Sequence, residues 1–217
     1  MTLKIKLSLK VASFLFLSII LASCEKKETP KPQVPVVSAD SAKKLDRKFA
    51  RERVGQILGT KVSFFEEGKF QEDSTAGVAA GTEKNDKTSW GIRFYYFKKA
   101  NNDLNKSYET PLLKGSFSES LVKKIKLSSA DYEMLYYDSQ AYFMGSGGGE
   151  IFSYIVDFNK NQVYYAHFFT VEKHPTSLYL SPNTDVKEIR NFFIRHFQKD
   201  YPDLKIVNKD YNLEDIF

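Results

Sequence analysis

The stretch that decides the fold reads Glu150-Ile151-Phe152-Ser153-Tyr154-Ile155-Val156-Asp157-Phe158, then Asn159-Lys160-Asn161-Gln162, then Val163-Tyr164-Tyr165-Ala166-His167-Phe168-Phe169-Thr170-Val171. Two segments rich in aromatic and β-branched residues flank a polar segment with two asparagines, a pattern that predicts a β-hairpin. One face is then expected to carry the pairs Phe158/Val163, Val156/Tyr165, Tyr154/His167 and Phe152/Phe169. That face is almost wholly apolar, so we expect it to meet the core.

Other strand signals lie on both sides of the hairpin. The best is residues 90–97, where Trp90, Ile92, Phe94 and Tyr96 share one face and the intervening residues share the other. Residues 62–65, 76–80, 121–127 and 204–207 are shorter candidates. Residues 101–111 are polar and indicate a loop, whereas residues 130–144 fit either a short helix or a pair of strands.

Two amphipathic segments predict helices near the two ends of the domain. The first spans residues 41–58, with Ser41 as its cap, Gly59 at its end, and a stripe formed by Leu45, Phe49, Ile57 and Leu58. The second is capped by Asn183 or Thr184, stops at Tyr201-Pro202, and has a stripe formed by Val186, Ile189, Phe193 and Phe197.

These elements together predict a single α+β domain over residues 41–217. We expect an antiparallel sheet of about six to eight strands, with an N-terminal helix and a helix near the C terminus. No internal repeat or shift in composition divides the domain.

The amino terminus has the order of an export signal. Lys4, Lys6 and Lys10 precede the apolar residues 11–22 without an intervening acid. This apolar run is too short to cross a bilayer as a helix, which takes about 20 residues. It is therefore expected to act as a signal and not as a permanent membrane span.

The segment Leu21-Ala22-Ser23-Cys24 resembles the lipobox of bacterial lipoproteins: an aliphatic residue, two small residues and a cysteine. The resemblance implies that residues 1–23 are cleaved and that Cys24 carries a diacylglyceryl group, with a further acyl chain such as palmitate on its amine. It places the protein in the bacterial cell envelope, at the outer membrane if the organism is Gram-negative. A secreted protein with a chance cysteine near its cleavage site is the alternative.

A charged, proline-rich tether is expected over residues 24–40, because prolines favour an extended, solvated chain. The formal net charge of +5 lies outside residues 45–217. The signal has three lysines and no acid, residues 24–44 have five basic and three acidic side chains, and residues 45–217 balance at 24 of each. A neutral domain lacks the basic surface of a nucleic-acid binder, so no nucleic-acid partner is expected.

Candidate catalytic residues are few. Cys24 is the only cysteine, so its acylation leaves the domain without a thiol or a cysteine metal site. His167, His174 and His196 fall in different elements without metal-ligand spacing, and we expect no metal or other cofactor. His167 is a weak catalytic candidate, which a concave pocket and a carboxylate within reach would support and a seal of apolar neighbours would oppose.

Candidate ligand-binding residues are tyrosines and glycines. Tyr95, Tyr164 and Tyr179 could offer flat aromatic faces to a sugar or a protein, although burial on both sides of their strands is the simpler expectation. Gly147 and Gly148 belong to a glycine-rich loop whose bare backbone could approach a ligand, although a flexible connection explains it as well. A phosphate-binding loop is not expected, because a strand follows the glycines and no Lys-Ser or Lys-Thr pair is present.

Three function classes remain open. The first is a non-enzymatic envelope lipoprotein, bound to membrane lipid through Cys24, that binds or scaffolds an envelope protein or glycan. The second is an envelope hydrolase that acts on glycan or peptide. The third is a periplasmic inhibitor or chaperone, which would show an exposed apolar groove or an unpaired sheet edge.

The anchor prediction is tested by changing Cys24 to Ser and fractionating the cells. We expect the variant to leave the membrane fraction for the soluble fraction, because two or more acyl chains supply stable attachment. Ser23→Ala, which keeps a small residue before the cysteine, is the control and should stay with the membrane. A Cys24→Ser variant that still follows the membrane would contradict lipid anchoring.

Overall fold

Two β-sheets make up most of the chain that the structure, a computed structural model, describes: residues 46–73, 76–86, 89–100, 103–143 and 148–208. These residues belong to one unit that extends over Lys43–Phe217. The expected signal, Cys24, the tether and the Ser41 cap lie outside the described residues, as does Gly147.

The first sheet is antiparallel and has the order β1-β2-β3-β4 within the described residues, with β5 also paired to β3. Its strands are β1 (Phe64–Gly68), β2 (Gly77–Asn85), β3 (Trp90–Ala100), β4 (Asp103–Glu109) and β5 (Leu113–Lys114). A bulge between Tyr96 and Phe97 shifts the register of β4 on β3.

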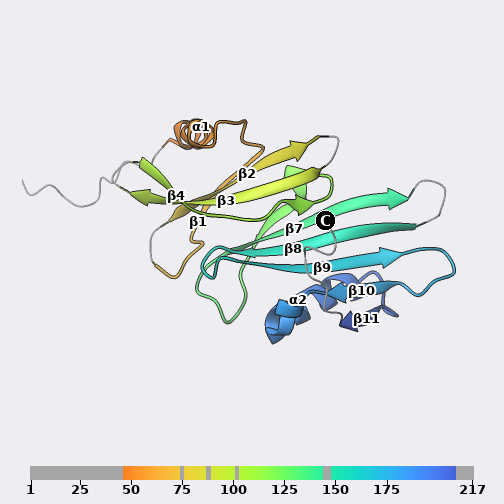
Figure 1. Ribbon diagram of the computed structural model, residues 1–217. Helices are drawn as coiled ribbons and strands as arrows, with labels where there is room; N and C mark the ends of the chain where they lie inside the picture. The colour runs from red at the N-terminus through yellow and green to blue at the C-terminus, as the bar shows by residue number, and fades with distance from the viewer. Residues whose placement is uncertain (1–45, 74–75, 87–88, 101–102, 144–147, 209–217) are drawn as a thin grey trace, which may run out of the picture. The chain divides into compact units, whose positions relative to one another are not determined.

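The second sheet has the order β11-β10-β9-β8-β7-β6 within the described residues, and Figure 1 shows β7, β8 and β9 side by side. Its strands are β6 (Val122–Ile125), β7 (Met134–Phe143), β8 (Gly148–Asp157), β9 (Gln162–Thr170), β10 (Ser177–Leu180) and β11 (Lys205–Asn208). The pair β10–β11 is parallel and the other pairs are antiparallel.

Three buried clusters define the layers. The inner core lies between the two sheets, where the Phe94 ring meets Tyr137 at 5.9 Å and Tyr96 stacks on Phe158 at 5.3 Å. The helix α1 (Arg47–Leu58) covers the outer face of the first sheet, and α2 (Lys187–Gln198) covers the outer face of the second. The order of layers is therefore helix, sheet, sheet, helix.

The expected α+β class, with a helix towards each end of the domain, is confirmed, but the described strands form two sheets where one was expected. The physical reason is visible in β3. Ile92, Phe94 and Tyr96 lie in the inner core, while Tyr95 and Phe97 lie in the core beneath α1. A strand that is apolar on both faces needs cover on both sides, and one helix and a second sheet provide it.

The central hairpin is confirmed with a corrected register. Val156 pairs with Val163, and Phe152 pairs with His167, so each expected partner is displaced by two residues. A shift of two keeps every side chain on its face, and the predicted apolar face does lie in the inner core. His167 is therefore opposite Phe152 and not opposite Tyr154.

Asp157 explains the corrected turn. It is fully buried, and its Oδ1 accepts the backbone N–H groups of Asn159 and Lys160 at 3.0 Å each. Its Oδ2 accepts the hydroxyl of Tyr132 at 3.0 Å. Asn161 takes the left-handed conformation, with φ of 54°, so the chain reverses over residues 158–161 and Gln162 joins β9.

The helix α1 buries a stripe that shares only Leu58 with the predicted one among the described residues. Ala50 and Val54 are buried, whereas Phe49 is 55% exposed and Ile57 is 37% exposed. Arg51 fixes the helix by donating to the carbonyl of Val62 at 2.9 Å. The small Ala50 permits close packing on the sheet, and this tertiary contact outweighs the larger apolar surface of Phe49.

The helix α2 follows its prediction closely. Ile189, Phe193 and Phe197 are buried, and the ring of Phe197 stacks on Phe168 of β9 at 4.9 Å. The helix begins later than expected, after the short 3-10 helix η2 (Pro182–Asp185), and ends at Gln198. Val186 is exposed and does not belong to the buried stripe.

Two segments contain strands that the sequence did not predict with certainty. The predicted loop 101–111 contains β4, whose Leu104 is buried beneath α1 while most of its polar side chains face outward. An edge strand with one buried face has this polar composition. The ambiguous segment 130–144 contains β7, and a short 3-10 helix, η1 (Glu119–Leu121), precedes β6.

Asp157 provides a test of the hairpin. Asp157→Ala leaves three donors without their acceptor, and we expect the free energy of unfolding to fall by about 2–4 kcal/mol in urea titrations. Tyr132→Phe removes one of these bonds and should cost about 1 kcal/mol. Asp203→Ala, at an exposed turn, is the control with an expected change near zero. Equal losses for Asp157→Ala and Asp203→Ala would contradict this account.

Candidate functional site

A cleft of about 300 Å³ opens at the end of the β2–β3 hairpin. Its lining combines one exposed and one half-buried aromatic side chain, a carboxylate, an ammonium group, an amide, a hydroxyl and the backbone of two glycines. The lining residues are Glu83, Lys84, Asn85, Trp90, Gly91, Gly115, Ser116 and Phe117.

Strand register places the first wall of this cleft. Trp90 lies two residues before Ile92, so its side chain points to the same face of β3, the face that holds the inner core further along. Glu83 pairs with Ile92 and Asn85 pairs with Trp90, and cross-strand partners share a face. The inner face of the first sheet therefore changes from apolar to Glu83, Asn85 and Trp90 where the inner core ends.

The second wall is the segment from Gly115 to Phe117, which two buried tyrosines hold. The hydroxyl of Tyr137 donates to the Ser116 carbonyl at 2.8 Å, and that of Tyr154 donates to the Lys114 carbonyl at 3.2 Å. Gly115 has φ of 111°, and a Cβ there would collide with the Ser139 side chain. Only glycine fits this close approach to β7.

The cleft has little net charge. Lys84 forms an ion pair with Asp86 at 3.3 Å, which leaves Glu83 as the second charged group of the lining. Burial raises the pKa of Tyr137, and the negative charge of Glu83 adds to this increase. Glu83 is the cross-strand partner of Ile92, so its carboxylate lies on the cleft side of β2.

His167 and Glu150 form a second group. The His167 Nε2 lies 2.8 Å from the Glu150 Oε2, and the imidazole stacks on Phe152 at 4.8 Å. Phe169, Tyr179 and Tyr165 also lie near the imidazole, at 6.2, 6.0 and 6.4 Å between ring centres. The His167 side chain is only 16% exposed.

Burial lowers the pKa of His167, and the hydrogen bond and charge of Glu150 oppose this decrease only in part. The imidazole is therefore neutral at pH 7, the form that a general base requires. The expected carboxylate is present, but the lining of the cleft does not include His167. Stacked aromatic rings cover much of the imidazole, and this seal of apolar neighbours opposes a catalytic role for His167.

His196 forms a further pair that the sequence did not suggest. Its Nε2 lies 3.1 Å from Oδ2 of Asp138 on β7, and Tyr136 and Ser153 both donate to Oδ1 of the same carboxylate. Burial raises the pKa of Asp138, but these donors outweigh it and the net shift is downward. In a catalytic triad the serine is hydrogen-bonded to the histidine, whereas Ser153 is bonded to Asp138. The group is therefore not a nucleophile–base pair. Its role is to fix α2 to the second sheet through the His196–Asp138 contact.

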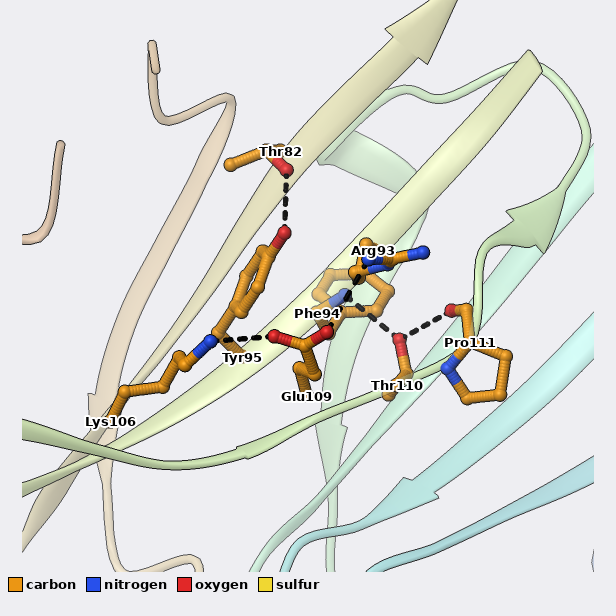
Figure 2. A network of polar contacts seen from close by, with 8 residues as sticks. All are labelled: Thr82, Arg93, Phe94, Tyr95, Lys106, Glu109, Thr110 and Pro111. Carbon is orange, nitrogen blue, oxygen red and sulfur yellow. Dashed lines mark hydrogen bonds and ion pairs between the residues drawn. The ribbon is translucent and has the colours of Figure 1, made fainter. Parts of the chain in front are cut away.

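Tyr95 lies inside the core beneath α1. Figure 2 shows its hydroxyl directed at Thr82, 3.3 Å away, and the Lys106 ammonium near its ring. That ammonium sits 5.7 Å from the ring centre and pairs with Glu109 at 2.6 Å. One face of Tyr95 is thus covered by the core and the other by a lysine.

The other sequence candidates are dispersed. Tyr164 is buried beneath α2, whereas Tyr179 is half-exposed beside His167. Gly148 begins β8, where a Cβ would press on the Thr170 backbone, so close strand approach accounts for this glycine. Of the candidates that the sequence offered among the described residues, the structure brings together His167 and Tyr179 and separates the rest.

Sequence reasoning missed the cleft itself. Trp90 and its position at a strand start were recognised, but its partners Glu83 and Asn85 lie across a hairpin whose register was not predicted. The available signal was the position of the only tryptophan at the end of an otherwise apolar strand face.

No group of three or more His, Cys, Asp or Glu side chains among the described residues could hold a metal ion. No helix in this part of the chain is long and apolar enough to cross a membrane.

Comparison with models of known protein families, with curated proteins and with solved structures found no match.

The burial of His167 gives a prediction for stability against pH. Its folded-state pKa is lowered, so the unfolded chain takes up this proton first as the pH falls below about 6.5. The stability that His167 contributes is therefore full above pH 6.5 and decreases below it. We expect His167→Gln to show a flatter decline in the free energy of unfolding between pH 7.5 and 5.

The exposed His174→Gln serves as the matched control and should keep the wild-type slope. Other groups cancel in the difference between wild type and variant, including the pair of His196 with Asp138. A wild-type protein that gains stability relative to His167→Gln as the pH falls would show that Glu150 dominates over burial.

Proposed function

We propose that this chain is a bacterial envelope lipoprotein that binds a small ligand, or a small part of a larger one, in the Trp90 cleft without transforming it. Acylated Cys24 joins it to membrane lipid, at the outer membrane in a Gram-negative organism. The observation that carries the proposal is a cleft of about 300 Å³ whose mouth exposes Trp90 beside Glu83 and Asn85.

Exposure of Trp90 is unusual for its place in the fold. The next residues on the same face, Ile92 and Phe94, are fully buried, whereas Trp90 is 40% exposed. Covering apolar surface stabilises a complex by roughly 25 cal/mol per Å². Small-molecule sites are concave and join apolar or aromatic surface to polar groups that orient the ligand. In this cleft Trp90 and Phe117 supply the aromatic surface, and the polar part of the lining is the larger one.

A hydrolase is the second candidate, supported by the hydrogen-bond distance between His167 and Glu150. A neutral imidazole beside a carboxylate is a suitable general base for glycan or peptide hydrolysis. The support is weaker because stacked rings surround His167 and the described cleft does not reach it. Binding at Trp90 therefore agrees better with the geometry.

The proposal is tested through the fluorescence of Trp90, which reports on the cleft alone because the chain has one tryptophan. The full-length protein in detergent is mixed with separated glycan, lipid and protein fractions of bacterial envelope. We expect a saturable change in emission with at least one fraction. Ser116→Phe, which fills the cleft, should weaken it at least tenfold, and Ser116→Ala should preserve it.

Emission that no fraction changes would contradict ligand binding at Trp90. A change that persists fully in Ser116→Phe would also contradict it, because the ligand would then bind outside the cleft.

A further inference from the structure

We infer that the ligand of the Trp90 cleft is a neutral saccharide, with one pyranose ring against the indole and its hydroxyl groups on the polar wall. This inference rests on the proposed function and specifies its ligand class. It follows from the shape of the Trp90 surface, the spacing of the polar groups and the charge of the lining.

The indole of Trp90 supplies the apolar part of the recognition. A pyranose presents a patch of C–H groups on one face and hydroxyl groups around its edge. An exposed aromatic face binds such a patch while leaving the edge free for hydrogen bonds. Trp90 is exposed at the mouth, and the half-buried Phe117 belongs to the opposite wall, so the cleft joins aromatic and polar surface.

Glu83 and Asn85 supply the polar part. They lie at i and i+2 on β2, about 7 Å apart along the strand, and both share the face of Trp90. A carboxylate accepts two or more hydrogen bonds, and an amide both donates and accepts. Adjacent hydroxyl groups of a sugar, which also donate and accept, match this pair, and Ser116 offers a further hydroxyl from the second wall.

The charge of the lining favours a neutral sugar over an acidic one. Lys84 is paired with Asp86, so the carboxylate of Glu83 is not balanced by that lysine within the cleft. A uronic acid would bring a second carboxylate close to Glu83, and like charges repel. The volume of about 300 Å³ lies at the lower end of the range for small-ligand sites, which suits a short stretch of glycan.

The test uses the full-length chain in detergent and Trp90 fluorescence. The probes are tetramers of glucose (β1,4- and α1,4-linked), a tetramer of N-acetylglucosamine, a tetramer of galacturonic acid, and a mixture of random tetrapeptides. We expect saturable binding of at least one neutral tetrasaccharide and at least tenfold weaker binding of the galacturonic acid tetramer.

Variants assign the contacts. Glu83→Gln and Asn85→Ala should each weaken the neutral tetrasaccharide about tenfold, which corresponds to about 1.4 kcal/mol. Trp90→Ala should abolish binding in calorimetry, and its unfolding transition shows whether it is folded. Phe49→Ala removes an aromatic of α1 that is even more exposed than Trp90, and this variant should bind as wild type.

The outcomes separate the two levels of the proposal. Binding of the tetrapeptides but of no neutral saccharide overturns the saccharide inference and leaves cleft binding intact. Saccharide binding that Glu83→Gln and Asn85→Ala leave unchanged overturns the assigned contacts. Failure of every probe together with every envelope fraction overturns both the inference and the proposed function.

Discussion

The inner core between the two sheets is the constraint on which the rest of the domain depends. Phe94 and Tyr96 from the first sheet meet Tyr137 and Phe158 from the second. Aromatic pairs of this kind supply large buried areas and fixed ring geometry. Because β3, β7, β8 and β9 are also apolar on their opposite faces, each sheet requires a helix on its outer side.

The same core determines where the cleft lies. On the inner face of β3 the side chains are fully buried as far as Ile92, whereas Trp90, the next residue on this face, is exposed. The hydroxyl groups of Tyr137 and Tyr154 extend from the core to the backbone of residues 114–116. Buried donors are costly when unpaired, so these bonds hold the second wall in place. The cleft is thus the open end of the core, with its walls fixed by core residues.

Histidines illustrate why a site is hard to derive from sequence. His167 was expected opposite Tyr154, but the turn stabilised by Asp157 moved its partner to Phe152 and brought Glu150 within 2.8 Å. The partner of His196 could not be predicted, because Asp138 lies on a different element, 58 positions earlier in the chain. Hydrogen bonds between distant elements depend on register and helix placement, which local patterns do not determine.

The sequence by itself determined the features that depend on local pattern: the central hairpin and its apolar face, the stripe of α2, the alternation of β3, and the neutral charge of residues 45–217. It also supports the expected export signal and lipobox. Tertiary structure alone decided the division into two sheets, the conversion of residues 103–109 into a strand, the burial of Ala50 in place of Phe49, and the meeting of Glu83, Asn85 and Trp90. The physical reason is that alternation fixes which residues share a face, whereas the partner that covers this face is chosen by packing across the whole chain.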